Sequence, residues 1–235
     1  MADRIQAYMN WSGGKDSAFC LYKALQDERF NITHLLTSVN AAHNRISMHG
    51  VRRELLIKQA EAIGLPLETI ELPEQPDMPG YEQAMLSKVQ HLKQEGCTHA
   101  MFGDIFLEDL RAYRERQLQQ QNIQCIFPLW KIDTTRLVKE FIQLGFKTII
   151  VCVNEQYLDK SFCGRVIDES FLADLPANVD PCGENGEFHS FVFEAPLFKQ
   201  PISIVKGDIV RREYPAPVPG EKPYGFYFCD ILPAG

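Results

Sequence analysis

The run IQAYMNW at residues 5–11 is followed directly by SGGKDS at residues 12–17. The first run is rich in apolar and β-forming residues, and Ala18, Leu21 and Leu25 then fall at helical spacing, which predicts a strand, a tight turn and a helix. Such a turn brings backbone N–H groups and the positive end of the helix dipole to one point, and adjacent glycines let a phosphate approach the main chain. This stretch therefore predicts an anion cradle at the end of a strand.

The same alternation of strand and helix continues through the first half of the chain. The expected strands are residues 5–11, 32–39, 67–72, 97–105 and 123–129, and the expected helices include residues 51–63 and 109–121, with a proline-rich loop at 73–80. Alternating strands and helices predict an α/β fold: a Rossmann-like parallel sheet with helices on both faces and right-handed crossovers.

The sequence pattern changes in the second half, where glycine and proline residues separate shorter strands. After a helix around Leu137 and Phe141, strands are expected at residues 147–153, 188–193, 201–214 and 224–232. These segments predict a smaller mixed α+β C-terminal domain. We place the division between residues 127 and 133, which gives domains at 1–130 and 131–235.

Composition excludes several classes of protein. The 235 residues are 45% hydrophobic and 23% charged, which is typical of a folded globular chain and not of a disordered one. A net charge of -7 makes nucleic acid an unlikely partner. The seven cysteines include no CxxC pair, and no apolar run has the length of a signal peptide or a membrane span, so we expect a cytoplasmic protein with reduced thiols.

The loop at residues 12–17 is not a Walker A motif. That pattern requires a glycine where this chain has Met9 and a hydroxyl residue where it has Asp16. SGGKDS instead resembles the PP-loop of the N-type ATP pyrophosphatases, which cleave ATP between the α and β phosphates. A plain glycine-rich turn with an exposed Lys15 is the alternative interpretation.

A second polar motif, CGENGEFH, occupies residues 182–189. If a strand begins near Glu187, then Glu187 and His189 share one face while Phe188 points to the core. The motif suits binding of an ammonium group or a polar substrate head. Three alternatives remain open: a solvated hairpin turn at Asn185-Gly186, a metal site that uses Cys182, and a reactive Cys182 thiol.

SGGKDS, GDI at residues 103–105 and GENGEFH at residues 183–189 together resemble the diphthine–ammonia ligase family. The resemblance implies a nucleotide-binding domain followed by a smaller substrate domain. It also implies an AMP-forming amide ligase, in which a substrate carboxylate attacks the α-phosphate of ATP and ammonia then displaces AMP. The expected cofactors are ATP and Mg²⁺, and the expected partners are a small-molecule or protein carboxylate and ammonia.

Further candidates lie near the expected sheet edge. Asp104 is a candidate for Mg²⁺ or ribose, or else a helix N-terminal acid. Arg111 and Arg114 are three residues apart and either face one anion or pair with neighbouring glutamates. His49, with the residue before it, either lines the adenine pocket or is a surface histidine.

These arguments and the resemblance together assign the following roles. Residues expected to bind ATP are Ser12, Gly13, Gly14, Lys15, Asp16, Ser17, Met48, His49, Gly103 and Asp104, with Asp16 and Asp104 also expected to bind Mg²⁺. Residues expected to be catalytic are Lys15, Glu184, Asn185 and Glu187, and those expected to contact substrate are Arg111, Arg114, Cys182 and His189.

Two other functions compete with the ligase. A PP-loop enzyme for sulfur transfer or RNA modification predicts paired cysteines and a basic surface, which the composition disfavours. A nucleotide-binding sensor without catalysis would not require the polar GENGEFH motif. The aromatic strand at residues 226–228 leaves a homodimer open, since it either completes a core or forms an edge.

Overall fold

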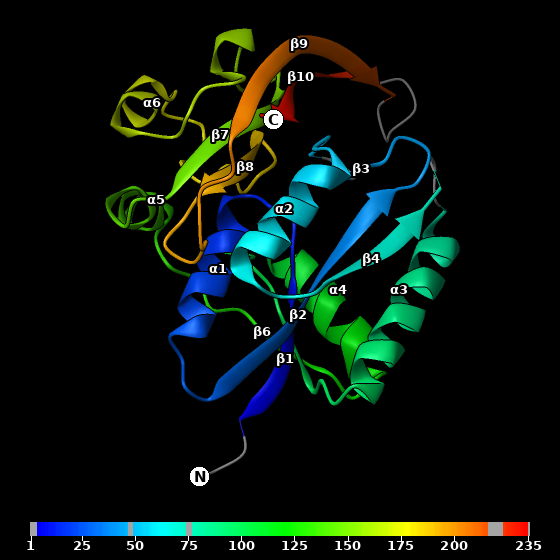
Figure 1. Ribbon diagram of the computed structural model, residues 1–235. Coiled ribbons are helices and arrows are strands. Elements are labelled where there is room, and N and C mark those ends of the chain that lie inside the picture. The colour runs from blue at the N-terminus through cyan, green and yellow to red at the C-terminus, as the bar shows by residue number, and fades with distance from the viewer. Residues whose placement is uncertain (1–3, 47–48, 74–76, 216–222, 235) are drawn as a thin grey trace.

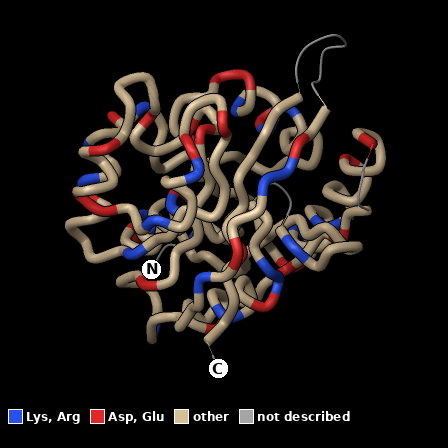
Figure 2. The backbone as a smooth tube through the Cα atoms, turned by 90° about the horizontal axis from the view of Figure 1, so that it is seen from above, with Lys and Arg blue, Asp and Glu red and all other residues tan. Residues whose placement is uncertain are grey.

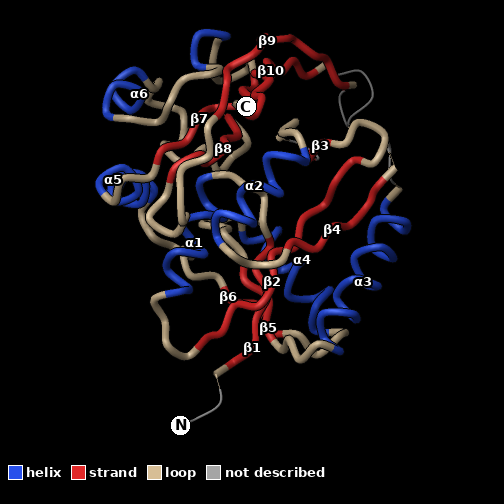
Figure 3. The backbone as a smooth tube through the Cα atoms, viewed as in Figure 1, coloured by secondary structure: helices blue, strands red, loops and turns tan. Residues whose placement is uncertain are grey.

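A computed structural model describes residues 4–46, 49–73, 77–215 and 223–234. Two β-sheets and their helices form a layered α/β molecule (Figure 1, Figure 3). Within these ranges no helix is long and apolar enough to span a membrane. Basic and acidic positions are interspersed along the backbone seen in Figure 2.

The first sheet holds the N-terminal strands. Four neighbouring pairs are parallel, β4 with β2, β2 with β1, β1 with β5 and β5 with β6, while the short β3 lies antiparallel to the end of β2. The strands are β1 (Ile5–Asn10), β2 (Phe30–Asn40), β3 (Arg45–Ile46), β4 (Leu67–Leu72), β5 (His99–Met101) and β6 (Gln124–Ile126). Because β1 is central, its carboxyl end opens at the point where ligands bind in such sheets.

Helices cover both faces of this sheet. Helices α1 and α2 lie on the side that faces the second sheet, and α3 and α4 lie on the other side (Figure 1). The bounds are α1 (Lys15–Leu25), α2 (Arg53–Ile63), α3 (Met78–Gln94) and α4 (Glu108–Gln119). Helices α1 and α2 each bury several apolar residues three or four positions apart, which pack on the sheet. Helix α3 buries Val89 and Leu92, and α4 buries Leu118.

The second sheet is antiparallel, in the order β8-β7-β10-β9. Its strands are β7 (Lys147–Asn154), β8 (Phe188–Glu194), β9 (Ile204–Tyr214) and β10 (Tyr224–Pro233). Helix α5 (Thr134–Gln143) precedes β7, and a 3-10 turn η1 (Lys160–Phe162) and helix α6 (Glu169–Asp174) lie between β7 and β8.

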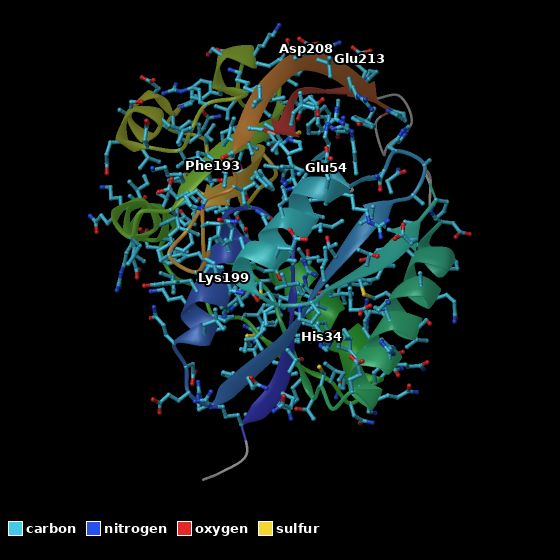
Figure 4. All side chains as sticks on the ribbon, viewed as in Figure 1. His34, Glu54, Phe193, Lys199, Asp208 and Glu213 are labelled. Carbon is cyan, nitrogen blue, oxygen red and sulfur yellow. The ribbon has the colours of Figure 1, made fainter. Side chains whose placement is uncertain are left out.

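One apolar core runs between the two sheets. Phe19 of α1 makes edge-to-face contacts with Phe141 and Phe146, at ring-centroid distances of 5.9 and 5.8 Å. The segment after β8 reaches back to α2, where the Lys199 amide donates to the carbonyl of Ala62 at 2.8 Å (Figure 4). The second sheet is therefore fixed against the helices that carry the phosphate-binding turn.

The structure confirms the predicted fold class and shifts several boundaries. Helix α3 starts inside the loop predicted at residues 73–80, because the Asp77 carboxylate accepts from the Gly80 amide at 2.9 Å and Pro79 occupies the first turn. β5 and β6 are shorter than expected, and β8 starts one residue after Glu187. Elements β3, η1 and α6 were not predicted, and the division at residue 130 stays a prediction.

Candidate active site

The turn at residues 12–17, called the phosphate loop from here on, joins β1 to α1. Gly14 is the N-cap of α1 and has no side chain of its own to cap that end. Gly13 has a φ of 75°, in the left-handed region that favours glycine. Its carbonyl accepts from the Gln59 amide and from the Val192 backbone, both at 2.9 Å. The loop is thus held from α2 and from β8 at once.

Lys15 is the buried cation of this loop. Its side chain is 3% exposed and forms an ion pair with Asp16, and its amide N–H donates to the Ser190 hydroxyl at 3.1 Å. Burial by itself lowers the pKa of Lys15, but the nearby Asp16 carboxylate, Cys182 and Glu184 more than offset this and raise the pKa above its ordinary value. Lys15 is therefore an ammonium ion held inside the protein.

The two serines of the loop are bonded to each other and to its backbone. The Ser12 and Ser17 hydroxyls lie 3.1 Å apart. Ser17 also donates to the Gly14 carbonyl at 2.9 Å, and the Gly14 amide donates to the Ser12 hydroxyl at 3.3 Å. These bonds keep the loop compact around the N-terminus of α1.

The segment after β5 closes one side of the loop. A Cβ on Gly103 would lie 2.8 Å from the Asp16 carbonyl carbon, so this backbone approach requires glycine. Asp104 follows and pairs with Arg114 of α4 at 2.9 Å, and the Arg114 guanidinium lies 4.4 Å from the centroid of the Phe102 ring. A carboxylate and a guanidinium are thereby placed beside the phosphate loop.

The GENGEFH loop, residues 183–189, supplies a carboxyl group from the other side. Glu184 Oε1 accepts from the amides of Ile105 and Phe106 at 2.7 and 3.3 Å. Burial, with repulsion from Asp16 and Asp104, outweighs those bonds and raises the pKa of Glu184 to about 7. Such a group exchanges a proton near neutral pH, as a general base must.

Glu187 has a different environment from Glu184. It is 1% exposed, and its carboxylate accepts from the amides of Asp180 and Asn185 at 2.9 Å each and from the Asn185 side chain at 3.0 Å. These bonds hold the turn that presents Glu184 and Asn185. The alternative of solvated charges on a hairpin turn therefore does not hold for Glu187, whose carboxylate is internal to the turn.

Two histidines meet across the two sheets. His49 follows β3, His189 lies on β8, and their rings stack at a centroid distance of 4.6 Å. Burial lowers the pKa of His49 to about 3, with repulsion from His189 as a further cause, and burial lowers the pKa of His189 to about 4. Both imidazoles are therefore neutral near pH 7.

These groups line one cavity of about 830 Å³ at the carboxyl ends of β1, β2, β4 and β5. Of the predicted site residues, it brings together Ser12, Gly14, Lys15, Asp16, Ser17, His49, Gly103, Asp104, Arg114, Cys182, Glu184, Asn185 and His189. The volume falls in the range of ordinary ligand sites.

Three of the predicted site residues do not line the cavity, and a fourth lies outside the described residues. Gly13 is absent from the lining, and its carbonyl accepts from Gln59. Glu187 is also absent from the lining, because its carboxylate is enclosed by the GENGEFH loop and the Asp180 amide. Arg111 pairs with Glu115 at 2.8 Å and lies over Trp130, so the expectation that it shares an anion with Arg114 is wrong. Met48 lies outside the described residues.

Sequence reasoning missed Gln59 and Ser190. Gln59 is fully buried on α2 and donates to the carbonyls of Gly13 and Val192, while its oxygen accepts from the Trp11 indole at 3.0 Å. Its signal was a polar residue on the apolar face of a predicted helix. Ser190, which holds the Lys15 amide, had no comparable signal.

Comparison with known proteins identifies the family. The model of the diphthamide synthase N-terminal domain matches residues 5–124, and that of the diphthamide synthase C-terminal domain matches residues 133–215. This chain belongs to the diphthine–ammonia ligase family.

Relatives of that name span most of the chain. The cow diphthine–ammonia ligase is 26% identical over 88% of this chain and 86% of its own length. The zebrafish enzyme is 28% identical over 82% of this chain and 84% of its own length. The human enzyme is 25% identical over 85% of this chain and 82% of its own length. The chain is accordingly an ATP-using ligase that forms a carbon–nitrogen bond.

The residues that the structure describes offer two carboxylates suited to Mg²⁺ and no closed protein metal site. Among the described residues, no group of three or more His, Cys, Asp or Glu side chains could hold a metal, which removes the predicted alternative of a site at Cys182. Asp16 and Asp104 both line the cavity and repel each other. Mg²⁺ needs one or two carboxylates plus phosphate oxygens, and these two residues fit that requirement.

Cys182 itself is 3% exposed, and its thiol donates to the Thr134 carbonyl at 3.4 Å. Burial raises its pKa to about 12. The thiol is therefore protonated at neutral pH, which argues against a nucleophile at this position.

Proposed function

We propose that this ligase transfers an acyl group through an adenylate. A substrate carboxylate oxygen attacks the α-phosphorus of ATP, the bond to the bridging oxygen breaks, and pyrophosphate leaves. Ammonia then attacks the acyl carbon, AMP leaves, and a base accepts the proton that the attacking nitrogen must lose. The observation that carries this proposal is the convergence of the phosphate loop and Glu184 on one cavity.

The phosphate loop and Lys15 are proposed to hold the pyrophosphate end of ATP. Lys15 keeps its charge in a buried position, so it attracts phosphate more strongly than an exposed lysine would. The positive end of the α1 dipole lies at the same loop, since Gly14 is the N-cap of that helix. The α-phosphate is then left open to a carboxylate that approaches along Asp104 and Arg114.

Asp16 and Asp104 are proposed to hold Mg²⁺. The ion would neutralise phosphate charge that otherwise repels an incoming carboxylate. Among this chain's own residues, Lys15 and Arg114 contribute to the same neutralisation.

Glu184 is proposed to be the general base for ammonia, since its pKa of about 7 suits exchange of the proton of an attacking amine. Asn185 lies at the rim of the cavity, and its side-chain N–H₂ donates to Glu187, so its oxygen is left to accept from ammonium. Glu187 acts as a positioning residue that holds both of them. His189 stays a proposed substrate contact.

The substrate is proposed to be a small-molecule or protein carboxylate. The relatives are named for diphthine and ammonia, and the same pair of reactants is one candidate for this chain. We also propose that the protein is located in the cytoplasm, and a homodimer is the assembly that remains to be tested.

Product analysis tests the reaction. Purified protein is incubated with Mg-ATP, ammonium and fractions of a cell extract, and nucleotides are separated. We expect substrate-dependent AMP and pyrophosphate. ADP and phosphate as the products, or no turnover with any fraction, would contradict an adenylate mechanism.

Two variants assign the steps. Glu184→Gln should lose amide formation by about 100-fold, because general-base catalysis contributes about 10²–10⁴-fold. It should retain exchange of labelled pyrophosphate into ATP, since the first step does not use this base. Glu169→Gln, at an exposed carboxylate on α6, is the matched control. Equal loss of exchange and amidation in Glu184→Gln would overturn the assignment.

A further inference from the structure

A second cavity of about 310 Å³ opens between α3 and α4, beside the ATP cavity. We call it the α3–α4 cavity. Its walls are mainly aromatic and aliphatic, and five of its lining residues also line the ATP cavity. These shared residues are Asn10, Tyr81, Met85, Phe102 and Arg114.

The α3–α4 cavity contains an unneutralised carboxylate. Glu82 accepts from the Tyr113 hydroxyl at 3.3 Å and from the Gln117 amide at 2.9 Å. Within the described part of the chain it has no Lys, Arg or His partner. A carboxylate bonded to neutral groups keeps its negative charge free to attract a cation or a strong N–H donor.

Aromatic rings line the same cavity as that carboxylate. Tyr8, Tyr81, Phe102 and Tyr113 all line the cavity. The faces of such rings attract cations, and their bodies exclude water from an organic ligand. The walls therefore favour a ligand with an apolar body and a positively charged nitrogen.

A positive charge, that of Arg114, lies one helical turn from Gln117, the residue that donates to Glu82. Arg114 and Gln117 are three residues apart on α4, so their Cβ atoms are about 5–6 Å apart. Arg114 pairs with Asp104 through Nε and one terminal nitrogen, which leaves further N–H groups for another carboxylate. Arg114 stands in the wall shared with the ATP cavity, on the side from which the proposed function has the carboxylate approach.

We propose that the α3–α4 cavity binds the acyl substrate, with its carboxylate at Arg114 and an amino group at Glu82. The substrate class is a short organic acid that carries an amino group several bonds from its carboxylate. This inference rests on the proposed function, because it places the acid that the adenylation step consumes. It also gives a role to the glutamine-rich end of α4, since Gln117, Gln120 and Gln121 line the cavity.

Pyrophosphate exchange tests the substrate class without ammonium. The probe acids are 4-aminobutyrate, 5-aminovalerate, 6-aminohexanoate and 4-(aminomethyl)benzoate. Each is compared with the same acid lacking the amino group. A charge-assisted hydrogen bond at Glu82 predicts at least about tenfold faster exchange with one or more of the amino acids. Exchange with none of them, or equal exchange with the plain acids, overturns the proposal.

Variants test the place of binding. Leu86 lines the α3–α4 cavity and not the ATP cavity, so Leu86→Trp should fill the former. Ser87→Trp puts the same side chain on the exposed face of α3 as a matched control. We expect Leu86→Trp to lose exchange with the probe acids while its affinity for Mg-ATP stays within about twofold of the parent. Retained exchange in Leu86→Trp overturns the location.

Glu82→Gln separates recognition from folding. The glutamine can still bond to Tyr113 and Gln117, but it lacks the charge. We expect pyrophosphate exchange to be equally fast with the amino-substituted acids and with the acids that lack the amino group, and the affinity for Mg-ATP to be unchanged. An unaltered preference contradicts the role of Glu82. If extract fractions yield AMP and pyrophosphate while the probe acids fail, this inference falls and the proposed function stands.

Discussion

Gln59 is the residue on which the phosphate loop most depends, because it bonds to the loop, to β8 and to Trp11. Gln59→Leu would leave buried donors and acceptors without partners. We expect the free energy of unfolding to fall by roughly 2–4 kcal/mol, measured by urea denaturation, and ATP to bind more weakly. Gln119→Leu, at an exposed site on α4, should change neither by more than about 0.5 kcal/mol.

Glu184 makes a pH-dependent contribution to stability. Its folded pKa is about 7 and its ordinary value is 4.5, so between these pH values the folded state keeps a proton that the unfolded chain has lost. Unfolding then releases a proton, and stability falls as pH rises from about 4.5 to 7. Melting temperatures across this range should converge toward those of Glu184→Gln at the acid end and diverge above it, with the parent the less stable. Parallel curves would contradict this account.

At the scale of elements, the close approach of the segment after β5 to the start of α1 is the critical contact. In Gly103→Ala the added Cβ would meet backbone atoms of Asp16 and Ser17, which cannot swing away as a side chain can. We expect ATP affinity to fall at least about tenfold, by calorimetry, because the loop must shift. Ser203→Ala, at an exposed site that does not line the cavity, should bind ATP normally.

The sequence predicts an element well where one physical signal dominates it. β4 was predicted at its observed bounds, because a short run with apolar and β-branched residues is flanked by glycine and prolines. The start of α3 was missed because prolines indicated a loop, whereas a proline in the first turn behind Asp77 is a helix start. β3 was missed because it has only two residues, which is too short a run to show a strand pattern, although it pairs with Val39 and Asn40 at the end of β2.

The site follows the same rule. The phosphate loop was predicted because its chemistry is local in sequence. The separate roles of Glu184 and Glu187 were not, since they depend on which carboxylate the turn encloses. Arg111 and Arg114 were also equivalent in sequence, and the neighbours Glu115 and Asp104 distinguish them.

At the scale of the whole molecule, Asp230 links the two sheets. It pairs with Arg45 at 2.9 Å and with Arg52 at 2.7 Å, and these arginines flank the segment that carries His49. The Arg52 hydrogen bond, with Arg45, lowers the pKa of Asp230, so the link persists above that carboxyl's ordinary pKa and is lost as pH falls. Asp230→Asn should cost about 1 kcal/mol in urea denaturation and weaken ATP binding. Unchanged ATP binding would show that this link does not hold the site.

The shared core predicts that both sheets unfold together. Phe19 is 2% exposed and contacts Phe141 and Phe146, which lead into the second sheet. Phe19→Ala should cost roughly 3–5 kcal/mol. Because the core is continuous, the backbone amides of β1 and β7 should lose equal protection against hydrogen exchange. Leu25→Ala, at a half-exposed site on the same helix, should leave both strands nearly unchanged. If β7 kept its protection in Phe19→Ala, the second sheet would be an independent folding unit, and the division predicted near residue 130 would mark a boundary in stability as well as in sequence.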